Sequence, residues 1–142
     1  AGEGYKPGTG PVSFELKGLD VTLSPMICFE DVFGPLGRML AHEGADVLLN
    51  LTNDGWFGEG AAQWQHAAMS VFRAVENRRT LVRCTNNGLT CWMDPQGRMH
   101  DEGFGDADDI YGAGFKVVHV PIPAAGREKH QPLYHRQGDW FG

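Results

Sequence analysis

The sequence predicts an α/β fold built on a mixed β-sheet that is covered by helices. An apolar run at residues 45–51 follows a helical stretch at 34–43, which itself follows a strand ending near residue 27. This strand–helix–strand spacing is that of a βαβ unit with parallel strands. Asn87-Gly88 lies between apolar runs at 80–85 and 89–93 and indicates an antiparallel hairpin. Parallel and antiparallel pairs together make the sheet mixed.

The N-terminal part is expected to enter this sheet through a hairpin. Residues 1–11 are rich in glycine and proline and are expected to form a loop lead-in. Residues 12–16 alternate apolar with polar, and pair in this prediction with a strand that starts at residue 21 and runs to residue 27. Proline is awkward inside a strand, so Pro25 predicts a bulge or break near Ser24.

Two helices follow from hydrophobic spacing. The first, at 34–43, has Pro35 in its first turn and Gly44 after its end. Its expected buried residues are Leu36, Met39 and Leu40. The second is expected at 61–77, with an apolar side formed by Trp64, Ala68, Val71, Phe72 and Val75. We expect that side to be buried, and the strand at 45–51 to be buried on both faces.

Polar residues of the second helix are expected on its other faces. Arg73 and Glu76 are three positions apart and can pair on a helix surface. Beyond the hairpin, residues 94–97 predict a tight turn, residues 101–114 an acidic loop and residues 115–121 a further strand. Residues 123–142 are expected to be an irregular tail, and the length of residues 1–142 fits one domain.

Composition excludes several classes of function. With 12 basic and 18 acidic side chains the net charge is −6, and no basic cluster stands out, so a nucleic-acid partner is not expected. No apolar run reaches the roughly 18 residues needed to span a bilayer. The six histidines lack metal-ligand spacing, so neither a metal nor a cofactor is expected. Cys84 and Cys91 are interpreted as two packed thiols on neighbouring strands rather than a disulfide.

Cys28 is the candidate nucleophile. It lies where an apolar strand meets a helix start, so that backbone N–H groups and the helix dipole favour a thiolate and an oxyanion. If residues 28–30 are extended, Cys28 and Glu30 project to one face. A buried core cysteine is the alternative for this segment taken alone. Trp56 and Phe57 follow in a polar loop, where they either fold onto the core or cover a hydrophobic substrate.

Several stretches, in order along the chain, resemble the carbon-nitrogen hydrolase (nitrilase) superfamily and, within it, the family of apolipoprotein N-acyltransferases. They cover nearly the whole chain. The resemblance begins with Ile27-Cys28-Phe29-Glu30 and ends with Tyr134 to Trp140. Between them lie Gly44 to Leu51 with Asn53 to Gly58, Trp64-Gln65-His66, Arg73 to Glu76, Arg83 to Thr90, and Asp94 to Gly97. The resemblance implies the C-terminal half of an αββα sandwich, a mixed sheet with two helices on one face.

The resemblance also implies roles. Cys28 would be the nucleophile, the backbone N–H of Phe29 an oxyanion donor and Glu30 a supporting carboxylate. Trp56 and Phe57 would contact substrate, with His66 beside them or serving as a plain hydrogen-bonded helix residue. The family's glutamate base and lysine lie upstream of the cysteine. Lys6 and Lys17 match neither context, so the chain alone is expected to be inactive.

The implied partners are the upstream half of the same domain, a phospholipid acyl donor and a lipoprotein acceptor. The reaction passes a fatty acyl group through a cysteine thioester to the N-terminal amine of a diacylglyceryl-cysteine, at the periplasmic face of a bacterial inner membrane. Half a sandwich would expose apolar sheet, which the upstream half or a homodimer would cover. The alternatives are a soluble amidase that hydrolyses small amides and a non-catalytic nitrilase-like module.

Overall fold

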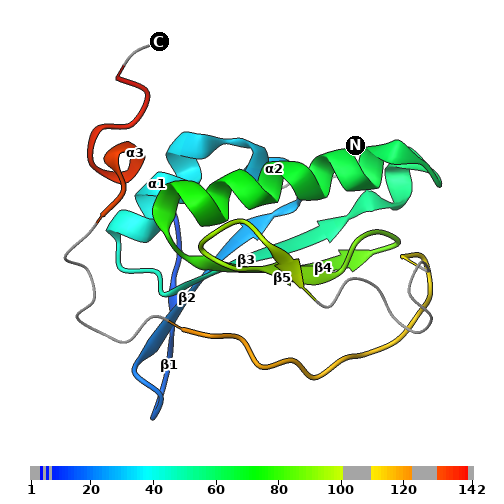
Figure 1. The fold of residues 1–142 in the computed structure, drawn as a ribbon, viewed down its shortest axis with the longest axis horizontal. Coiled ribbons are helices and arrows are strands. Elements are labelled where there is room, and N and C mark those ends of the chain that lie inside the picture. Colours follow the sequence, from blue (N-terminus) through cyan, green and yellow to red (C-terminus); the bar gives the residue numbers. More distant parts are fainter. Residues whose placement is uncertain (1–3, 5, 7, 101–109, 123–130, 141–142) are drawn as a thin grey trace.

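The computed structural model describes residues 4, 6, 8–100, 110–122 and 131–140 (Figure 1). These residues form a six-stranded sheet in the order β1-β2-β3-β4-β5-β6. The strands are β1 (Phe14–Leu16), β2 (Val21–Ile27), β3 (Val47–Asn53), β4 (Thr80–Asn86), β5 (Cys91–Met93) and β6 (Met99–His100). The sheet is mixed, as predicted, because β2, β3 and β4 are parallel and the other strands pair antiparallel.

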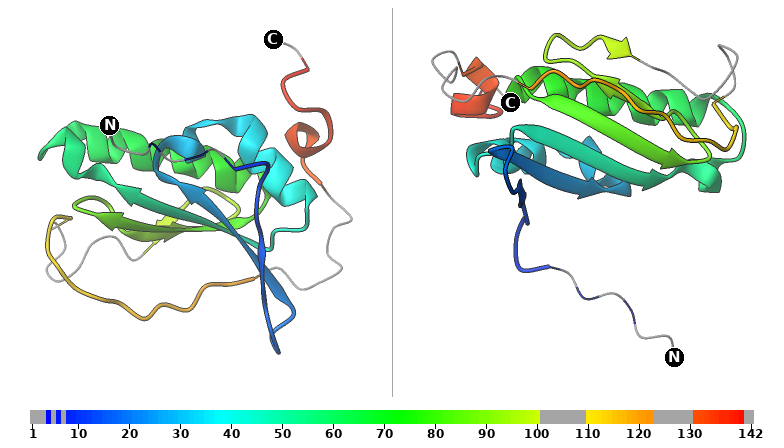
Figure 2. Two further views of the ribbon diagram at one scale, coloured as in Figure 1. Left: turned by 180° about the vertical axis from the view of Figure 1, so that it is seen from behind. Right: turned by 90° about the horizontal axis from the view of Figure 1, so that it is seen from below.

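Two long helices cover one face of this sheet (Figures 1 and 2). Helix α1 (Gly34–His42) joins β2 to β3, and helix α2 (Ala61–Asn77) joins β3 to β4. Each connection links parallel neighbours, so the chain contains two successive βαβ units. The three parallel strands end at the same edge of the sheet, where the short 3₁₀ helices η1 (Cys28–Val32) and η2 (Asp54–Phe57) follow β2 and β3.

The break expected near Ser24 is absent. Strand β2 pairs with β3 without interruption from Leu23 to Ile27. Pro25 is tolerated because β1 pairs only with residues up to Leu23, so within the described part of the chain no strand pairs with Pro25 on that side and requires an N–H there.

Helix α1 matches its predicted position but not its predicted buried side. Gly44 follows it at φ +97°, a conformation that suits glycine. Leu40 is buried and Leu36 packs partly against the core, but Met39 is exposed, so its predicted burial is wrong. Gly37 is buried instead: a Cβ there would come within 2.9 Å of Arg73 Cδ, so the missing side chain lets α1 approach α2 closely.

Helix α2 has its predicted bounds, but the side that we expected to be buried faces outward. Trp64, Ala68, Phe72 and Val75 are exposed, and of the predicted side only Val71 packs partly against the core. The buried positions follow a 3-4-3-4 spacing and are mostly polar: Gln63, His66, Ser70, Arg73 and Asn77, with Ala67 and Ala74 beside them. The helix therefore presents a polar stripe to the sheet.

The C-terminal segments pack around this frame. The predicted turn at residues 94–97 is present, with Gly97 N–H donating to the Asp94 carbonyl at 2.9 Å.

Residues 115–121 form no strand, so that prediction is wrong. These residues instead cross the face of the sheet opposite the helices, where Thr80 Oγ1 donates to the Pro121 carbonyl (Figure 2). The tail is not wholly irregular, since α3 (Leu133–Gln137) docks through its carbonyls onto Arg38. Residues 101–109, most of the predicted acidic loop, lie outside the described residues.

The sheet face opposite the helices is apolar and partly open. Ile27 and Leu51 are neighbours in register and expose 55% and 46% of their surface, so β3 is buried on both faces only in its first half. The core lies on the helix side and includes Met26, Leu40, Leu48, Ala67, Ala74, Leu81 and Met93. No helix in the described part of the chain is long and apolar enough to cross a bilayer.

Candidate active site

Cys28 occupies a strained backbone position at the end of β2. It is the first residue of η1 and has φ +52°, in the left-handed region that costs a non-glycine residue roughly 1–2 kcal/mol. Such strain persists only where the surrounding structure holds it, and it concentrates at functional sites. Cys28 is half-buried, so its sulfur is neither sealed in the core nor fully exposed.

The extended geometry that we expected for residues 28–30 is wrong, because these residues begin the 3₁₀ helix. Glu30 therefore turns back, and its Oε2 accepts a hydrogen bond from the Ile27 N–H at 2.7 Å. Phe29 lies in the first helical turn, and Ile27 supplies no side-chain cap to the N–H groups there. The roles suggested for the Glu30 carboxylate and the Phe29 N–H remain predictions.

A pocket of about 590 Å³ opens beside Cys28 at the carboxyl edge of the parallel strands. Trp56, which is 83% exposed, forms part of its wall. The lining residues come from the ends of all three parallel strands and the turns after them: Ile27, Cys28, Leu51, Thr52, Asn53, Trp56, Cys84, Thr85 and Asn86. Cys28 and Trp56 thus line the same pocket, and the roles expected for them remain predictions.

Phe57 and His66 do not line this pocket. The Phe57 ring is half-exposed and meets the His66 ring edge-on, with centroids 6.4 Å apart. The Phe29 ring lies 5.5 Å from the same imidazole. These two aromatic rings cover His66, which is only 4% exposed.

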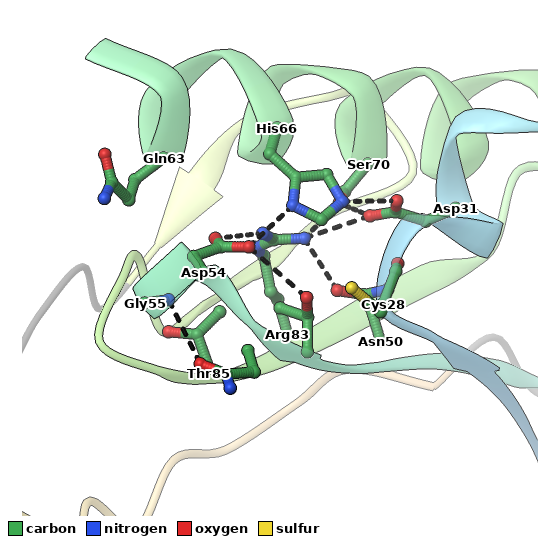
Figure 3. Close-up of polar contacts among 12 residues, drawn as sticks. Cys28, Asp31, Asn50, Asp54, Gly55, Gln63, His66, Ser70, Arg83 and Thr85 are labelled. Atoms are coloured by element: carbon green, nitrogen blue, oxygen red, sulfur yellow. Dashed lines mark hydrogen bonds and ion pairs between the residues drawn. The ribbon is translucent and has the colours of Figure 1, made fainter. Parts of the chain in front are cut away.

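On the helix-covered side of the sheet lies a buried network of four ionisable side chains (Figure 3). Arg83 Nη2 donates to Asp54 Oδ2 at 2.7 Å, and Arg83 Nη1 to Asp31 Oδ2 at 3.0 Å. His66 lies between the same carboxylates, with Nδ1 2.7 Å from Asp54 Oδ1 and Nε2 2.9 Å from Asp31 Oδ1. We call Asp31, Asp54, His66 and Arg83 the ionic quartet.

The quartet is charge-balanced when His66 is protonated. Both imidazole nitrogens face carboxylate oxygens, and only the imidazolium donates from both. Burial alone would lower the pKa of His66, but the hydrogen bonds to Asp31 and Asp54 outweigh it and raise that pKa to about 9. Burial likewise would raise the pKa of Asp54, but the His66 hydrogen bond and the Arg83 charge lower it overall. Two positive charges therefore compensate two negative ones.

Two neutral side chains connect the quartet to the backbone around Cys28. Asn50 Oδ1 accepts from Arg83 Nη1 at 2.6 Å, while Asn50 Nδ2 donates to the Cys28 carbonyl at 2.9 Å (Figure 3). Ser70 Oγ donates to Asp31 Oδ2 and accepts from Arg83 Nη1. The quartet is therefore bonded to the turn that carries Cys28.

Arg73 and Glu76 pair as predicted, and the pair also supports the same turn. Arg73 Nε and Nη2 donate to the two Glu76 carboxylate oxygens, both at 2.8 Å. Arg73 Nη1 donates to the carbonyls of Asp31 and Val32 at the end of η1. Arg73 is only 6% exposed, so its charge is not on a solvated face.

Sequence reasoning missed Asp31, Asn50, Asp54, Ser70 and Arg83. A signal for two of them was present: Asn50 and Arg83 interrupt apolar strands at positions that share the helix-facing side, and they are direct neighbours in register. A charged residue inside an apolar strand needs a partner of opposite charge. Among the described residues no group of three histidine, cysteine, aspartate or glutamate side chains is arranged to hold a metal ion. Cys28, Cys84 and Cys91 form no disulfide with one another.

Comparison with known proteins identifies related chains. Apolipoprotein N-acyltransferase 2 of Treponema pallidum is 38% identical over 141 residues, which is 97% of this chain and 24% of that protein. Apolipoprotein N-acyltransferase of Thermotoga maritima is 34% identical over 142 residues, 96% of this chain and 25% of that protein. The chain thus spans about a quarter of the length of these curated relatives.

Solved structures and a sequence family agree on the fold. A mutant amidase from Nesterenkonia sp. AN1, with acrylamide added at its active-site cysteine, aligns with a TM-score of 0.55 at 23% identity over 69% of this chain and 40% of that one. Nit3 of Saccharomyces cerevisiae, a nitrilase-superfamily member, gives a TM-score of 0.55 at 20% identity, over 69% of this chain and 38% of that one. The carbon-nitrogen hydrolase family matches residues 3–106, and the chain therefore belongs to that family.

Proposed function

We propose that this chain is the cysteine-bearing part of an acyltransferase that moves a fatty acyl group from a phospholipid to a lipoprotein amine. The observation that carries the proposal is the left-handed Cys28 at the mouth of the pocket formed by the ends of the parallel strands. The similarity to two apolipoprotein N-acyltransferases over nearly the whole chain supports the choice of substrates.

The proposed reaction has two steps, acylation of Cys28 and transfer of the acyl group to the amine. Cys28 Sγ attacks the ester carbonyl of the phospholipid; a C–S bond forms, the ester C–O bond breaks, and the leaving alkoxide takes up the thiol proton. The α-amine of diacylglyceryl-cysteine then attacks the thioester; a C–N bond forms, the C–S bond breaks, and the thiol is regenerated with the amine's proton. Splitting the transfer into two steps is the usual advantage of a covalent nucleophile.

The residues of the chain would divide this work. Cys28 forms the thioester, and the Phe29 N–H is proposed to stabilise the oxyanion of each tetrahedral intermediate. Glu30 is proposed to contribute negative charge near the thiol. The exposed Trp56 side chain, at the wall of the pocket, offers apolar surface to the acyl chain.

The remaining catalytic groups are proposed to come from an upstream half of the same domain, which supplies a glutamate base and a lysine. The apolar row of Ile27, Leu51 and Cys84 on the open sheet face fits such a covering partner. In that arrangement the pocket faces the periplasm at the inner membrane. A homodimer of this chain is the alternative cover for the same surface.

An amidase that hydrolyses small amides is the second candidate, and the fold of the Nesterenkonia amidase favours it. The test uses a protein extended upstream of Ala1, incubated in parallel with phospholipid vesicles and with butyramide. Mass spectrometry then follows the acylated protein, and ammonia release follows amide hydrolysis. Acylation by phospholipid without ammonia release supports the acyltransferase; the reverse result supports the amidase.

The non-catalytic module is tested with the same protein. It predicts that Cys28→Ala leaves function intact, whereas both enzymatic proposals predict complete loss of turnover. Cys84→Ala is the matched control, because Cys84 lines the same pocket and has no role in the proposed reaction.

A further inference from the structure

The strained conformation of Cys28 needs an external restraint. Its φ of +52° is in the left-handed region, and no glycine is present at this position to accept that geometry freely. A non-glycine residue keeps this conformation only where the surrounding structure holds it.

Asn50 supplies a restraint that the reaction itself does not use. It is fully buried on β3, and its Nδ2 donates to the Cys28 carbonyl at 2.9 Å. A carbonyl held from one side fixes the peptide plane that follows Cys28, and this plane carries the Phe29 N–H. One hydrogen bond thereby restrains both the backbone at Cys28 and the direction of the proposed oxyanion donor.

The orientation of the Asn50 amide is determined by Arg83. Arg83 has only donors, so its contact of 2.6 Å with Asn50 requires the amide oxygen on that side. The amide nitrogen must then face Cys28. Arg83 is itself held by Asp31 and Asp54, so the amide is aligned by groups that cannot rotate freely.

The other end of the turn is fixed to the same quartet. Asp31 lies three residues after Cys28, is fully buried, and contacts both Arg83 and His66. Its backbone carbonyl also accepts from Arg73. Both ends of the Cys28 turn are therefore attached to one rigid, charge-balanced cluster.

We propose that Asn50 is a positioning residue, whose amide, aligned by Arg83, holds the Cys28 carbonyl and fixes the turn that presents the sulfur to the pocket. The inference deepens the proposed function and rests on it for Cys28 being the nucleophile. Asn50 touches no substrate; it acts through the Cys28 backbone.

The kinetic test uses Asn50→Asp and Asn50→Ala in the upstream-extended protein. Asn50→Asp keeps the size and removes the N–H donor, while Asn50→Ala removes the whole amide. The expected result is a fall in kcat for acyl transfer of about 10- to 100-fold with KM for phospholipid unchanged, because misplacement affects chemistry more than binding. An unchanged kcat in a folded Asn50 variant would overturn the proposal.

Asn77→Asp is the matched control. Asn77 is an equally buried asparagine that donates to a backbone carbonyl, that of Arg73, on α2. The same substitution there removes a buried hydrogen bond without touching Cys28. A loss of kcat in Asn77→Asp equal to that in Asn50→Asp would show that general destabilisation explains both, and would contradict a positioning role.

A spectroscopic readout separates this inference from the proposed reaction. In the 142-residue chain, the one-bond Cα–Hα coupling of Cys28 reports the sign of φ. We expect a positive φ in the unsubstituted chain and in Asn77→Asp, and its loss in both Asn50 variants. If the extended protein forms no acyl adduct while the coupling changes as expected, the proposed function fails, and only the restraint of Asn50 on the Cys28 backbone stands.

If both Asn50 variants fail to fold, the unsubstituted chain alone still tests whether the Asn50 amide holds the Cys28 carbonyl. The side-chain amide protons of Asn50 should then exchange with solvent slowly, in step with the amides of the β3 core. Fast exchange of these protons, or a negative φ at Cys28, would overturn the inference.

Discussion

Two neighbouring rows of the three parallel strands face opposite sides of the sheet and invert the usual distribution of polarity. Met26, Asn50 and Arg83 form one row, face the helices and are fully buried. Ile27, Leu51 and Cys84 form the next row, face away and are exposed. The row that contains the charged Arg83 side chain is buried, and the apolar row is exposed.

The difference indicates that the two faces serve different purposes. A buried charge is retained only when it is paired, and a buried ion pair seldom adds stability over apolar packing. The quartet is therefore better explained by what it positions, which is the turn at Cys28. The open apolar row, in contrast, is surface that a further part of the protein is proposed to cover.

The largest expected effect on stability comes from removing the charge in the buried row. Arg83→Leu leaves the Asp31 and Asp54 carboxylates buried without their main counter-charge, and should lower the free energy of unfolding by about 3–5 kcal/mol. Urea unfolding measures the change. Arg98→Leu, at an exposed arginine, is the control and should change that free energy by less than about 0.5 kcal/mol. Equal effects of the two substitutions would contradict the role given to Arg83.

The two faces are compared directly by truncating one leucine on each. Leu48 is fully buried against the helices and Leu51 is 46% exposed. Leu48→Ala should lower the free energy of unfolding by about 2–5 kcal/mol, and Leu51→Ala by under about 1 kcal/mol. The second effect is smaller because folding buries less of the Leu51 side chain. In the upstream-extended protein the cost of Leu51→Ala should rise. A cost that stays the same there would argue against a covering half on this face.

The charge state of His66 gives a pH test of the quartet. Its folded pKa of about 9 is above the ordinary 6.5, so its stabilisation is complete below pH 6.5 and is lost as the pH rises through 9. The shift corresponds to about 3 kcal/mol of unfolding free energy. Unfolding free energies measured from pH 6 to pH 10 should fall over this window, and should not fall in His66→Gln. A flat profile in the unsubstituted chain would mean that the imidazole is neutral.

The smallest effect on stability is expected at Trp56. Because its side chain is 83% exposed, Trp56→Ala should leave the unfolding free energy within about 0.5 kcal/mol. The same change should raise KM for phospholipid in the extended protein, through loss of apolar surface at the pocket wall. Trp64→Ala, an exposed tryptophan on the outer side of α2, is the control and should leave that KM unchanged.

The fold was predictable where local patterns decide it. The βαβ unit, the bounds of α2 and the Asn87-Gly88 hairpin all follow from spacing and turn chemistry within short windows. The face that α2 buries was not predictable, because the large apolar residues Trp64 and Phe72 are exposed while His66, Ser70 and Arg73 are buried. Hydrophobic periodicity assumes an apolar interior, and the interior under α2 is an ionic one.

The site was predictable only in its exposed half. Cys28 and Trp56 stand out because a thiol at a strand end and an aromatic in a polar loop are local signals. The partners of Arg83 come instead from η1, η2 and α2, which the chain brings together only on folding. The four members of the quartet are spread from residue 31 to residue 83, so no short stretch of sequence contains them all.

The proposed reaction requires the Cys28 sulfur to receive an acyl group from a phospholipid. To test this, the upstream-extended protein is incubated with phospholipid carrying a deuterated acyl chain, and its peptides are analysed by mass spectrometry. We expect one labelled chain on the peptide containing Cys28, none on that containing Cys84, and release by hydroxylamine. Labelled acyl on Cys84, or an unlabelled Cys28 in a protein that still acylates lipoproteins, would contradict it.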